Sequence, residues 1–371
     1  MLEKHKKSAL IAMSGGVDSS VAAYLMLQQG YRCEGTTMRL YRNEDIGLSP
    51  FHTCCSQRDI DDAGEVAFQL DIPYEVLDFT AEFKERVIEK FIRIYETGGT
   101  PNPCIDCNRY MKFDYMLRFA KARELEYVVT GHYARIEYDT GTGRYLLKKA
   151  ADSGKDQSYV LYMLNQDQLA HMQFPLGTKT KTEVRMLADQ LGFCNARKHD
   201  SQDICFVPDG DYTKFMEQYT GKHYAPGAFM DLNGAIVGRH RGAVRYTLGQ
   251  RKGLGLAMGS PVYVCGKDMQ ANTVSVGPES ALYSKSLLAE EMNWIAISRL
   301  DGPLRVKAKT RYRQTEQAAT VYPEGERRIR LEFDEPQRAV TVGQAVVLYD
   351  GDTVVGGGTI CETGKEGEKP C

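Results

Sequence analysis

Two patterns of apolar residues alternate through about the first 135 positions of the chain. Short apolar runs predict strands, and they lie at 8–13, 32–38, 74–77 and 127–130. Segments with apolar residues at helical spacing predict helices, and they lie at 18–29, 58–70, 80–95 and 111–124. Strands that alternate with helices are typical of a parallel sheet with helices on both faces. We therefore predict an α/β domain, with a hairpin at 134–149 and a capped helix at 177–192.

The pattern changes after about residue 210, where glycine becomes dense. From about residue 283, short β-branched runs such as LRVKAKTRYR, RRIRLEF and QAVVLYD are separated by Gly, Pro and Asp turns. Such runs are typical of a small β-barrel or sandwich. We predict an α/β domain at 1–209, a small central domain at 210–282 and a C-terminal β-barrel domain at 283–371.

The composition is that of an ordinary globular enzyme, because 42% of the 371 residues are hydrophobic and 26% are charged. No apolar run approaches the roughly 18 residues of a membrane helix. The apolar run near the N-terminus spans only about six residues, which is too short for a signal peptide. We therefore expect a cytoplasmic protein without a membrane partner. Its ten cysteines would then be mostly reduced thiols, open to thiol chemistry or metal binding.

The net charge of −2 does not indicate a nucleic-acid partner, but the distribution of the charge does. Between Leu232 and Gly266 there are five Lys or Arg residues and no Asp or Glu. Further along, basic residues occupy every second position: Arg305, Lys307, Lys309, Arg311 and Arg313. If that stretch is a strand, all five side chains leave from one face and favour a phosphate backbone as partner. The alternative is a solvated edge strand that its cations protect from pairing.

The segment 12-AMSGGVDSS-20 stands between a predicted strand and a predicted helix. Glycines let a ligand approach the backbone closely, and a helix N-terminus attracts an anion. Asp18 would repel a phosphate unless a cation intervenes, and a magnesium ion between the two resolves that conflict. The alternative is a Gly-Ser turn that only caps the helix. The lysine of the common GxxxxGK[ST] loop is absent from this segment.

This segment resembles the SGGxDS loop of the N-type ATP pyrophosphatases, or PP-loop enzymes. Those enzymes bind ATP on the loop, release pyrophosphate and leave an adenylated substrate. The resemblance implies an adenine nucleotide alpha hydrolase-like domain that binds ATP and Mg²⁺. The implied nucleotide contacts are Ala12, Met13, Ser14, Gly15, Gly16, Val17, Asp18, Ser19, Met38 and Gly131.

Further motifs run almost the length of the chain, among them 100-TPNPCIDCNRYMKF-113, 130-TGHYAR-135, 154-GKDQSYVLYML-164, 199-HDSQDICF-206, 245-RYTLGQRKGLG-255 and 343-GQAVVLYDGD-352. Together they resemble the tRNA-specific 2-thiouridylase family, which converts the wobble uridine of certain tRNAs to 2-thiouridine. The resemblance implies adenylation of the uridine at the C2 oxygen, followed by sulfur transfer from a cysteine persulfide. Cys107 would be the nucleophile and Cys205 the persulfide carrier.

The same resemblance implies partners and tRNA contacts. The partners are tRNAs for Lys, Glu and Gln, and a cysteine desulfurase or sulfur-relay protein as donor. Residues expected to meet the tRNA are Asn102, Pro103, Cys104, His132, Lys155, Asp156, Gln157, Arg311, Tyr312 and Gln344.

The two cysteines of 101-PNPCIDCN-108 pose separate questions. The predicted helix at 111–124 places Cys107 just before its start, with Asn108 as N-cap, where the helix dipole would lower the thiol pKa. Cys104 stands where many family members carry Asp, so the usual acid/base group is missing there. Either the thiols form a redox pair with persulfide chemistry, or Cys104, Cys107 and Cys205 ligate a [4Fe–4S] cluster.

Structural zinc would need a fourth ligand, so it is the weaker alternative. We expect the other seven cysteines to be structural or incidental: Cys33, Cys54, Cys55, Cys194, Cys265, Cys361 and Cys371. Two other functions remain open: a PP-loop ligase that acts on a small molecule, and a non-enzymatic protein that binds RNA or senses a metal.

Overall fold

The structure is a computed structural model, and it describes residues 6–42, 57–200, 204–207 and 209–364. The chain divides into two compact units. The first unit contains Met1–Ile88, Pro103–Asp211 and Gly351–Val354, and the second contains Glu89–Asn102, Tyr212–Asp350 and Val355–Cys371.

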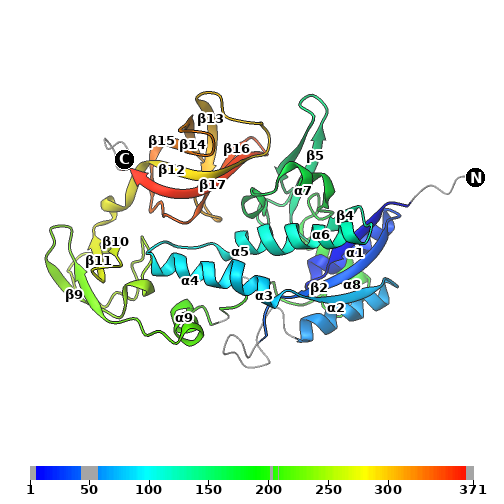
Figure 1. The fold of residues 1–371 in the computed structure, drawn as a ribbon, viewed down its shortest axis with the longest axis horizontal. Coiled ribbons are helices and arrows are strands. Elements are labelled where there is room, and N and C mark those ends of the chain that lie inside the picture. Colours follow the sequence, from blue (N-terminus) through cyan, green and yellow to red (C-terminus); the bar gives the residue numbers. More distant parts are fainter. Residues whose placement is uncertain (1–5, 43–56, 201–203, 208, 365–371) are drawn as a thin grey trace, which may run out of the picture. The chain divides into compact units, whose positions relative to one another are not determined.

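A parallel sheet of five strands forms the centre of the first unit (Figure 1), in the order β3-β2-β1-β4-β7. The strands are β1 (Ser8–Ala12), β2 (Arg32–Arg39), β3 (Tyr74–Asp78), β4 (Tyr127–Val129) and β7 (Met172–Gln173). Every neighbouring pair is parallel, so the predicted α/β fold is confirmed. Because β2 and β4 lie on opposite sides of β1, the strand order reverses there, and such a point is where open α/β sheets bind ligands.

Helices cover this sheet. Those of the first unit are α1 (Val17–Gln28), α2 (Gln57–Gln69), α3 (Thr80–Phe83), α5 (Pro103–Asp106), α6 (Met116–Ala122), α7 (Gln166–His171) and α8 (Lys181–Gln190). One apolar core joins α1, α2 and α8 to one face of the sheet, and it includes Ile11, Val21, Ala63 and Val184. Because side chains of a strand alternate in direction, Leu10 leaves from the other face, and α6 packs on β1 and β4.

Two of the predicted helices contain π-helical turns. The helix predicted at 80–95 runs from α3 through a π-helical segment, Lys84–Ile88, into α4 (Glu89–Glu96) of the second unit. The helix predicted at 111–124 begins earlier, at Pro103, and passes through the π-helical segment Cys107–Tyr115 into α6.

The predicted hairpin and capped helix are confirmed. The hairpin is β5 (Ala134–Asp139) with β6 (Arg144–Lys149), which pair antiparallel. The capped helix is α8, where the Thr180 side chain accepts from the Glu183 backbone and the Glu183 carboxylate accepts from the Thr180 backbone. This reciprocal capping box fixes the start of α8 at Lys181.

The second unit contains a small mixed sheet in the order β10-β11-β8-β9. Its strands are β8 (Gly227–Met230), β9 (Ile236–His240), β10 (Tyr263–Asp268) and β11 (Thr273–Gly277), and α9 (Tyr212–Thr220) precedes them. Phe229, Val264 and Val274 form the core of this sheet. Aromatic stacking joins two helices of the second unit. The ring centroids of Tyr95 in α4 and Tyr212 in α9 lie 4.2 Å apart.

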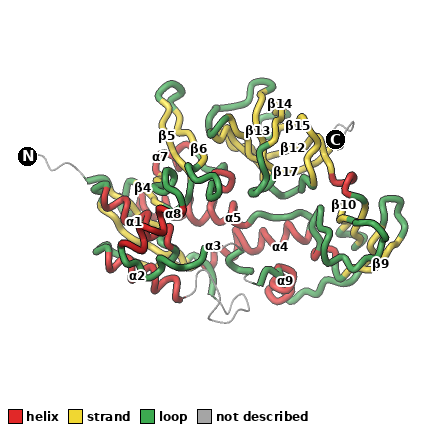
Figure 2. Tube along the Cα trace, turned by 180° about the vertical axis from the view of Figure 1, so that it is seen from behind, coloured by secondary structure: helices red, strands yellow, loops and turns green. Residues whose placement is uncertain are grey.

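A closed β-barrel of six strands follows, as the sequence predicts (Figure 2). The strands are β12 (Tyr283–Trp294), β13 (Leu304–Lys309), β14 (Gln317–Pro323), β15 (Ile329–Arg338), β16 (Ala345–Asp350) and β17 (Thr353–Gly364). Antiparallel pairing of β12 with β17 closes the barrel, and Leu331, Phe333 and Val346 fill it. The domain boundaries at 209 and 282 stay a prediction.

The prediction of five basic side chains on one strand face is wrong in its second half. Arg305 and Lys307 leave from the face of β13 opposite to the buried Val306 and Ala308. The strand ends at Lys309, because the Thr310 backbone and hydroxyl both donate to the Gln314 side chain and close a turn. Arg311 and Arg313 therefore lie beyond the strand.

In the part of the chain that the structure describes, no helix is both long and apolar enough to cross a membrane.

A test of the barrel core uses the single tryptophan, Trp294, which packs against it. We expect Phe333→Ala to cost roughly 3–5 kcal/mol of unfolding free energy, because it removes a ring that is only 1% exposed. Urea unfolding followed by Trp294 fluorescence measures the change. Tyr283→Ala, at a ring 41% exposed, is the control and should cost no more than about 1 kcal/mol. Equal midpoints for the two variants would contradict the assigned core.

Candidate active site

The segment 12-AMSGGVDSS-20 forms the connection between β1 and α1, as predicted. Gly16 is the N-cap of α1, and Gly15 has a φ of 69°, a left-handed conformation that favours glycine. Because α1 has twelve residues, its N-terminus carries a partial positive charge beside the loop. The connection therefore has the backbone of an anion-binding turn.

Side chains occupy three carbonyl oxygens of this loop. Hydrogen bonds run from Thr37 to the Met13 oxygen (2.6 Å), from Asn195 and Lys198 to the Gly15 oxygen (3.1 and 3.0 Å), and from Ser19 and Ser20 to the Gly16 oxygen (2.9 and 3.2 Å). An anion on the loop consequently meets fewer uncompensated oxygen lone pairs.

Gly131 brings the loop after β4 against the loop after β1. A Cβ atom at Gly131 would lie 2.7 Å from the carbonyl carbon of Asp18 and 2.8 Å from the nitrogen of Ser19. Both are backbone atoms, so no side chain can move aside to make room. Met38, at the end of β2, is half-buried. Nucleotide contacts by Gly131 and Met38 stay predictions.

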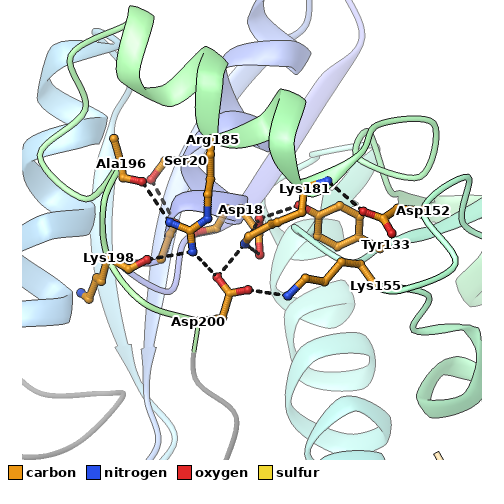
Figure 3. A network of polar contacts seen from close by, with 12 residues as sticks. Asp18, Ser20, Tyr133, Asp152, Lys155, Lys181, Arg185, Ala196, Lys198 and Asp200 are labelled. Carbon is orange, nitrogen blue, oxygen red and sulfur yellow. Dashed lines mark hydrogen bonds and ion pairs between the residues drawn. The ribbon is translucent and has the colours of Figure 1, made fainter. Parts of the chain in front are cut away.

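Asp18 takes part in a network of ion pairs (Figure 3). The Lys181 ammonium donates to both Asp18 carboxylate oxygens, at 2.7 and 2.8 Å, and also lies 2.7 Å from Oδ1 of Asp200. The Tyr133 hydroxyl donates to Asp18 at 2.8 Å. Burial and the Asp18 charge both raise the pKa of Tyr133, so this hydroxyl keeps its proton. A cation does accompany Asp18, as the sequence indicates, but it is a lysine; magnesium stays a prediction.

Asp200 binds two further cations. Lys155 lies 2.7 Å from Oδ2 of Asp200, and Arg185 lies 2.9 Å from Oδ1. Burial alone would raise the pKa of the Asp200 carboxyl, but hydrogen bonds from Lys155 and Lys181 outweigh it and lower the pKa to about 2. Asp200 is therefore a carboxylate at any physiological pH.

The segment 195–200 contacts the SGGVDSS loop. Asn195 and Lys198 bind the Gly15 carbonyl, and Lys198 also pairs with Asp59 and Asp62 of α2 at 2.6 and 2.5 Å. Arg185 of α8 donates to the Lys198 carbonyl at 3.2 Å. The loop, α2 and α8 thus share one polar support.

Cys107 lies inside a helix rather than before one. The helical run begins at Pro103, and the Asn108 side chain donates to the Val160 carbonyl at 3.1 Å instead of capping a helix. Burial raises the pKa of the Cys107 thiol to about 11, although the nearby Lys112 acts against this. The predicted N-cap and the predicted low thiol pKa are therefore wrong. The reason is that a helix interior lacks the unpaired N–H groups of a helix start, and the apolar surroundings disfavour the thiolate.

Cys205 is half-buried and lies next to an aromatic cluster. The Tyr41 hydroxyl donates to the Cys205 carbonyl at 2.8 Å. The Phe83 ring contacts both Tyr41 and Phe206, with centroids 5.9 and 5.7 Å apart. Tyr41, two residues after β2, and Phe83 of α3 therefore hold the backbone around Cys205.

The side chains do not fit the predicted iron–sulfur cluster. Across 6–42, 57–200, 204–207 and 209–364, no three Cys, His, Asp or Glu side chains are grouped so as to hold a metal ion. Cys104, Cys107 and Cys205 all belong to these ranges, and they differ in environment: exposed, buried and half-buried.

Cys33 is buried in the core of the first unit, in keeping with a structural role. Cys54, Cys55 and Cys371 lie outside the described residues.

The predicted tRNA contacts of the first unit have internal partners. His132 is 8% exposed and shares a 2.6 Å hydrogen bond with Thr130. Burial holds the pKa of His132 well below its usual value, so the ring is neutral. Asp156 accepts from Ala150 and from Ser158, and Gln157 accepts from the Tyr133 backbone at 2.9 Å. Contact of these residues, and of Lys155, with tRNA stays a prediction.

In the second unit, Arg311 and Gln344 likewise have internal partners, and Tyr312 is exposed. The Arg311 guanidinium donates to the Ala339 carbonyl at 2.7 Å. Gln344 donates to the carbonyls of Thr100 and Pro101, at 2.7 and 3.2 Å, and so holds the backbone just before Asn102. Their tRNA contacts, and those of Asn102, Pro103 and Cys104, stay predictions.

The sequence analysis missed Lys181, Asp200, Lys198, Asn195 and Tyr133. Tyr133 and Asp200 lie inside motifs that it singled out, and Lys181 begins the predicted capped helix. A charged or polar residue that has no assigned role inside a recognised motif was therefore the feature that could have identified them. Only the fold shows which of them meet.

A Gly131→Ala variant tests the close approach to the loop. The added methyl would displace the Asp18–Ser19 backbone, so we expect affinity for ATP to fall by roughly tenfold or more, with the fold retained. Calorimetric titration with ATP measures it. Gly64→Ala is the control, because its Cβ would meet only the Tyr74 ring at an ordinary 3.4 Å. Unchanged ATP affinity in Gly131→Ala would separate this loop from the nucleotide site.

The raised pKa of Cys107 predicts a pH profile. A thiol with a pKa of about 11 reacts through a small thiolate fraction, which grows about tenfold for each pH unit below that value. We expect the rate of iodoacetamide alkylation at Cys107, followed by peptide mass spectrometry, to rise throughout the range from about pH 7 to about pH 9.5. A rate that levels off below about pH 8 would show a lowered pKa instead.

Three family models match the chain in sequence order. The model described as "tRNA methyl transferase HUP domain" matches residues 7–209. The model described as "tRNA methyl transferase PRC-barrel domain" matches 213–278, and the "Aminomethyltransferase beta-barrel domain" matches 284–360. These matches correspond to the parallel-sheet domain, the central sheet and the six-stranded barrel.

Similar proteins match over nearly their whole length. A protein of Acetivibrio thermocellus named tRNA-specific 2-thiouridylase MnmA is 51% identical over 96% of this chain and 99% of its own. Proteins with the same name from Symbiobacterium thermophilum and Clostridioides difficile are 50% and 48% identical, over 95% of this chain and 92% and 98% of theirs. Identity at this level, along the chain that carries the SGGVDSS loop, Cys107 and Cys205, places the protein in the tRNA-specific 2-thiouridylase MnmA family, a family of enzymes.

Proposed function

We propose that this enzyme uses ATP to convert the wobble uridine of tRNA to 2-thiouridine. The observation that carries the proposal is the arrangement of the first unit. There, the segment 195–200 that precedes Cys205 in the chain binds the Gly15 carbonyl of the SGGVDSS loop. A site for nucleotide activation and a candidate persulfide carrier are therefore built on one scaffold.

The chemistry needs both parts. The uridine C2 oxygen attacks the α-phosphorus of ATP, and pyrophosphate leaves. The terminal sulfur of a Cys205 persulfide then attacks C2, and AMP leaves. The Cys107 thiolate attacks the Cys205 sulfur, which releases 2-thiouridine and leaves a Cys107–Cys205 disulfide. A thiol reductant must reduce that disulfide before the next turnover.

The burial of the two thiols supports this division of roles. Cys205 is half-buried, which suits a group that receives sulfur from another protein. Cys107 is buried and holds its proton at neutral pH, which suits a thiol that reacts only once substrate is bound. We propose that the donor is a cysteine desulfurase or a sulfur-relay protein.

The remaining details of the proposal follow the family resemblance. The substrates would be tRNAs for Lys, Glu and Gln, the location the cytoplasm, and a Mg²⁺ ion would enter with ATP and bind Asp18. Methyl transfer, which the descriptions of two of the matching family models mention, needs neither a pyrophosphate-releasing loop nor two cysteines. A PP-loop ligase that acts on a small molecule likewise needs no second thiol.

Nucleoside mass spectrometry tests the proposal. The protein is incubated with unmodified tRNA, Mg-ATP, a persulfide donor and a thiol reductant, and the tRNA is digested. We expect 2-thiouridine from the unmodified protein, and a loss of at least about a hundredfold in Cys107→Ser and in Cys205→Ser, because each removes a covalent participant.

Cys361→Ser in the barrel is the matched control and should retain full activity. Absence of 2-thiouridine from folded protein with an active donor would overturn the proposal. Full activity of Cys205→Ser would overturn the two-cysteine relay alone.

A further inference from the structure

Lys181 binds two carboxylates from different segments. One is Asp18 of the SGGVDSS loop, and the other is Asp200 of the segment 195–200. A lysine ammonium has three N–H donors. The structure gives Lys181 three carboxylate oxygens, two from Asp18 and one from Asp200, at 2.7, 2.8 and 2.7 Å (Figure 3). The donors of Lys181 are thus all engaged, and a phosphate that approaches the loop must displace a carboxylate to reach them.

The two carboxylates are not equally dependent on Lys181. Asp200 also binds Lys155 and Arg185, so it keeps two cations if Lys181 leaves. Asp18 would keep the neutral hydroxyl of Tyr133. Release of Lys181 from Asp200 is therefore the less costly exchange.

The Lys181 ammonium lies among other charges and is poorly exposed to water. Three cations, Lys155, Lys181 and Arg185, contact the side chains of Asp18 and Asp200, and a third carboxylate, Asp152, accepts from the Lys181 backbone at 3.0 Å. The Lys181 side chain is 11% exposed, so water screens its charge weakly. A triphosphate on the loop would bring further anionic oxygens, which would compete with Asp200 for a donor of this weakly screened ammonium.

We propose that Lys181 is a nucleotide-contacting residue and that Asp200 is its built-in competitor. In the arrangement that the structure shows, Asp200 holds one Lys181 donor. When the triphosphate binds, that donor passes to a phosphate oxygen while Asp200 remains paired with Lys155 and Arg185. The inference rests on the proposed use of ATP and adds a residue that sets nucleotide affinity.

The competition predicts opposite effects for the two partners. Lys181→Met removes a charge-assisted hydrogen bond to phosphate, so we expect the Kd for nucleotide to rise by roughly tenfold or more. Asp200→Asn leaves only a neutral amide oxygen to accept from the third donor, which weakens the competition, so we expect the Kd to fall by about threefold. In the Lys181→Met background, Asp200→Asn should leave the Kd for nucleotide unchanged within about a factor of two.

The measurement is calorimetric titration with Mg²⁺ and α,β-methylene ATP, which cannot release pyrophosphate. It compares the unmodified protein, Lys181→Met, Asp200→Asn and the double variant. Lys179→Met, which removes the same charge two positions earlier, is the matched control and should stay within about twofold of the unmodified protein. Lys181→Arg keeps the charge and brings five donors, so Asp200→Asn should change its Kd less than it changes that of the unmodified protein.

Each outcome decides a separate claim. If Asp200→Asn lowers the Kd equally with Lys and with Met at position 181, simple repulsion explains the gain and the inference is wrong. If Lys181→Met unfolds, the same comparison in the Lys181→Arg background decides, and an equal gain there overturns the inference. If the unmodified protein binds no nucleotide, both the inference and the proposed function fail. If it binds and Lys181→Met binds equally well, only the inference fails.

Discussion

An acidic side chain at the anion-binding end of a helix is the constraint on which the first unit depends. Asp18 stands in the first turn of α1, where the helix dipole favours negative charge, and the phosphates of the proposed nucleotide would approach the same turn. An ionised carboxylate removed from water needs a partner, and Lys181 supplies it with two hydrogen bonds. The position of Lys181 depends in turn on the capping box that starts α8 at that residue.

The supports of Asp18 extend outward from this pair. Lys181 reaches Asp200, Asp200 holds Lys155 and Arg185, and Arg185 binds the backbone of the segment that carries Lys198. These side chains are mostly half-buried, so loss of one partner leaves a charge that water compensates only in part. Movement of the SGGVDSS loop would therefore break its contacts with Lys181, Asn195 and Lys198.

The sequence predicts the strands of this unit well and the network poorly, for physical reasons. Strands β1 to β4 are apolar runs, and helices α1 and α8 have local start and stop signals. Neighbouring residues in the sequence are therefore enough to predict each of these elements. The strand β7 has two residues and no pattern to read. Asp18, Tyr133, Lys155, Lys181 and Asp200 come from five separate segments. Their pairing is a product of the strand order, which spacing along the chain does not encode.

The misplaced start of the helix around Cys107 has a similar origin and changes the chemistry. Pro103 suits the first position of a helix, since its missing N–H needs no partner, but the prolines of 101-PNPC-104 also resemble a turn. With the start at Pro103, Cys107 lies in the helix interior, and burial rather than the dipole sets its pKa. A thiol with a pKa of about 11 resists alkylation and oxidation in the resting protein, because the thiolate is the reactive form. It can attack Cys205 only if the bound substrate supplies a base or changes the surroundings of the thiol. The burial that makes Cys107 a poor nucleophile in the free enzyme would therefore limit its reaction to the complex with substrate.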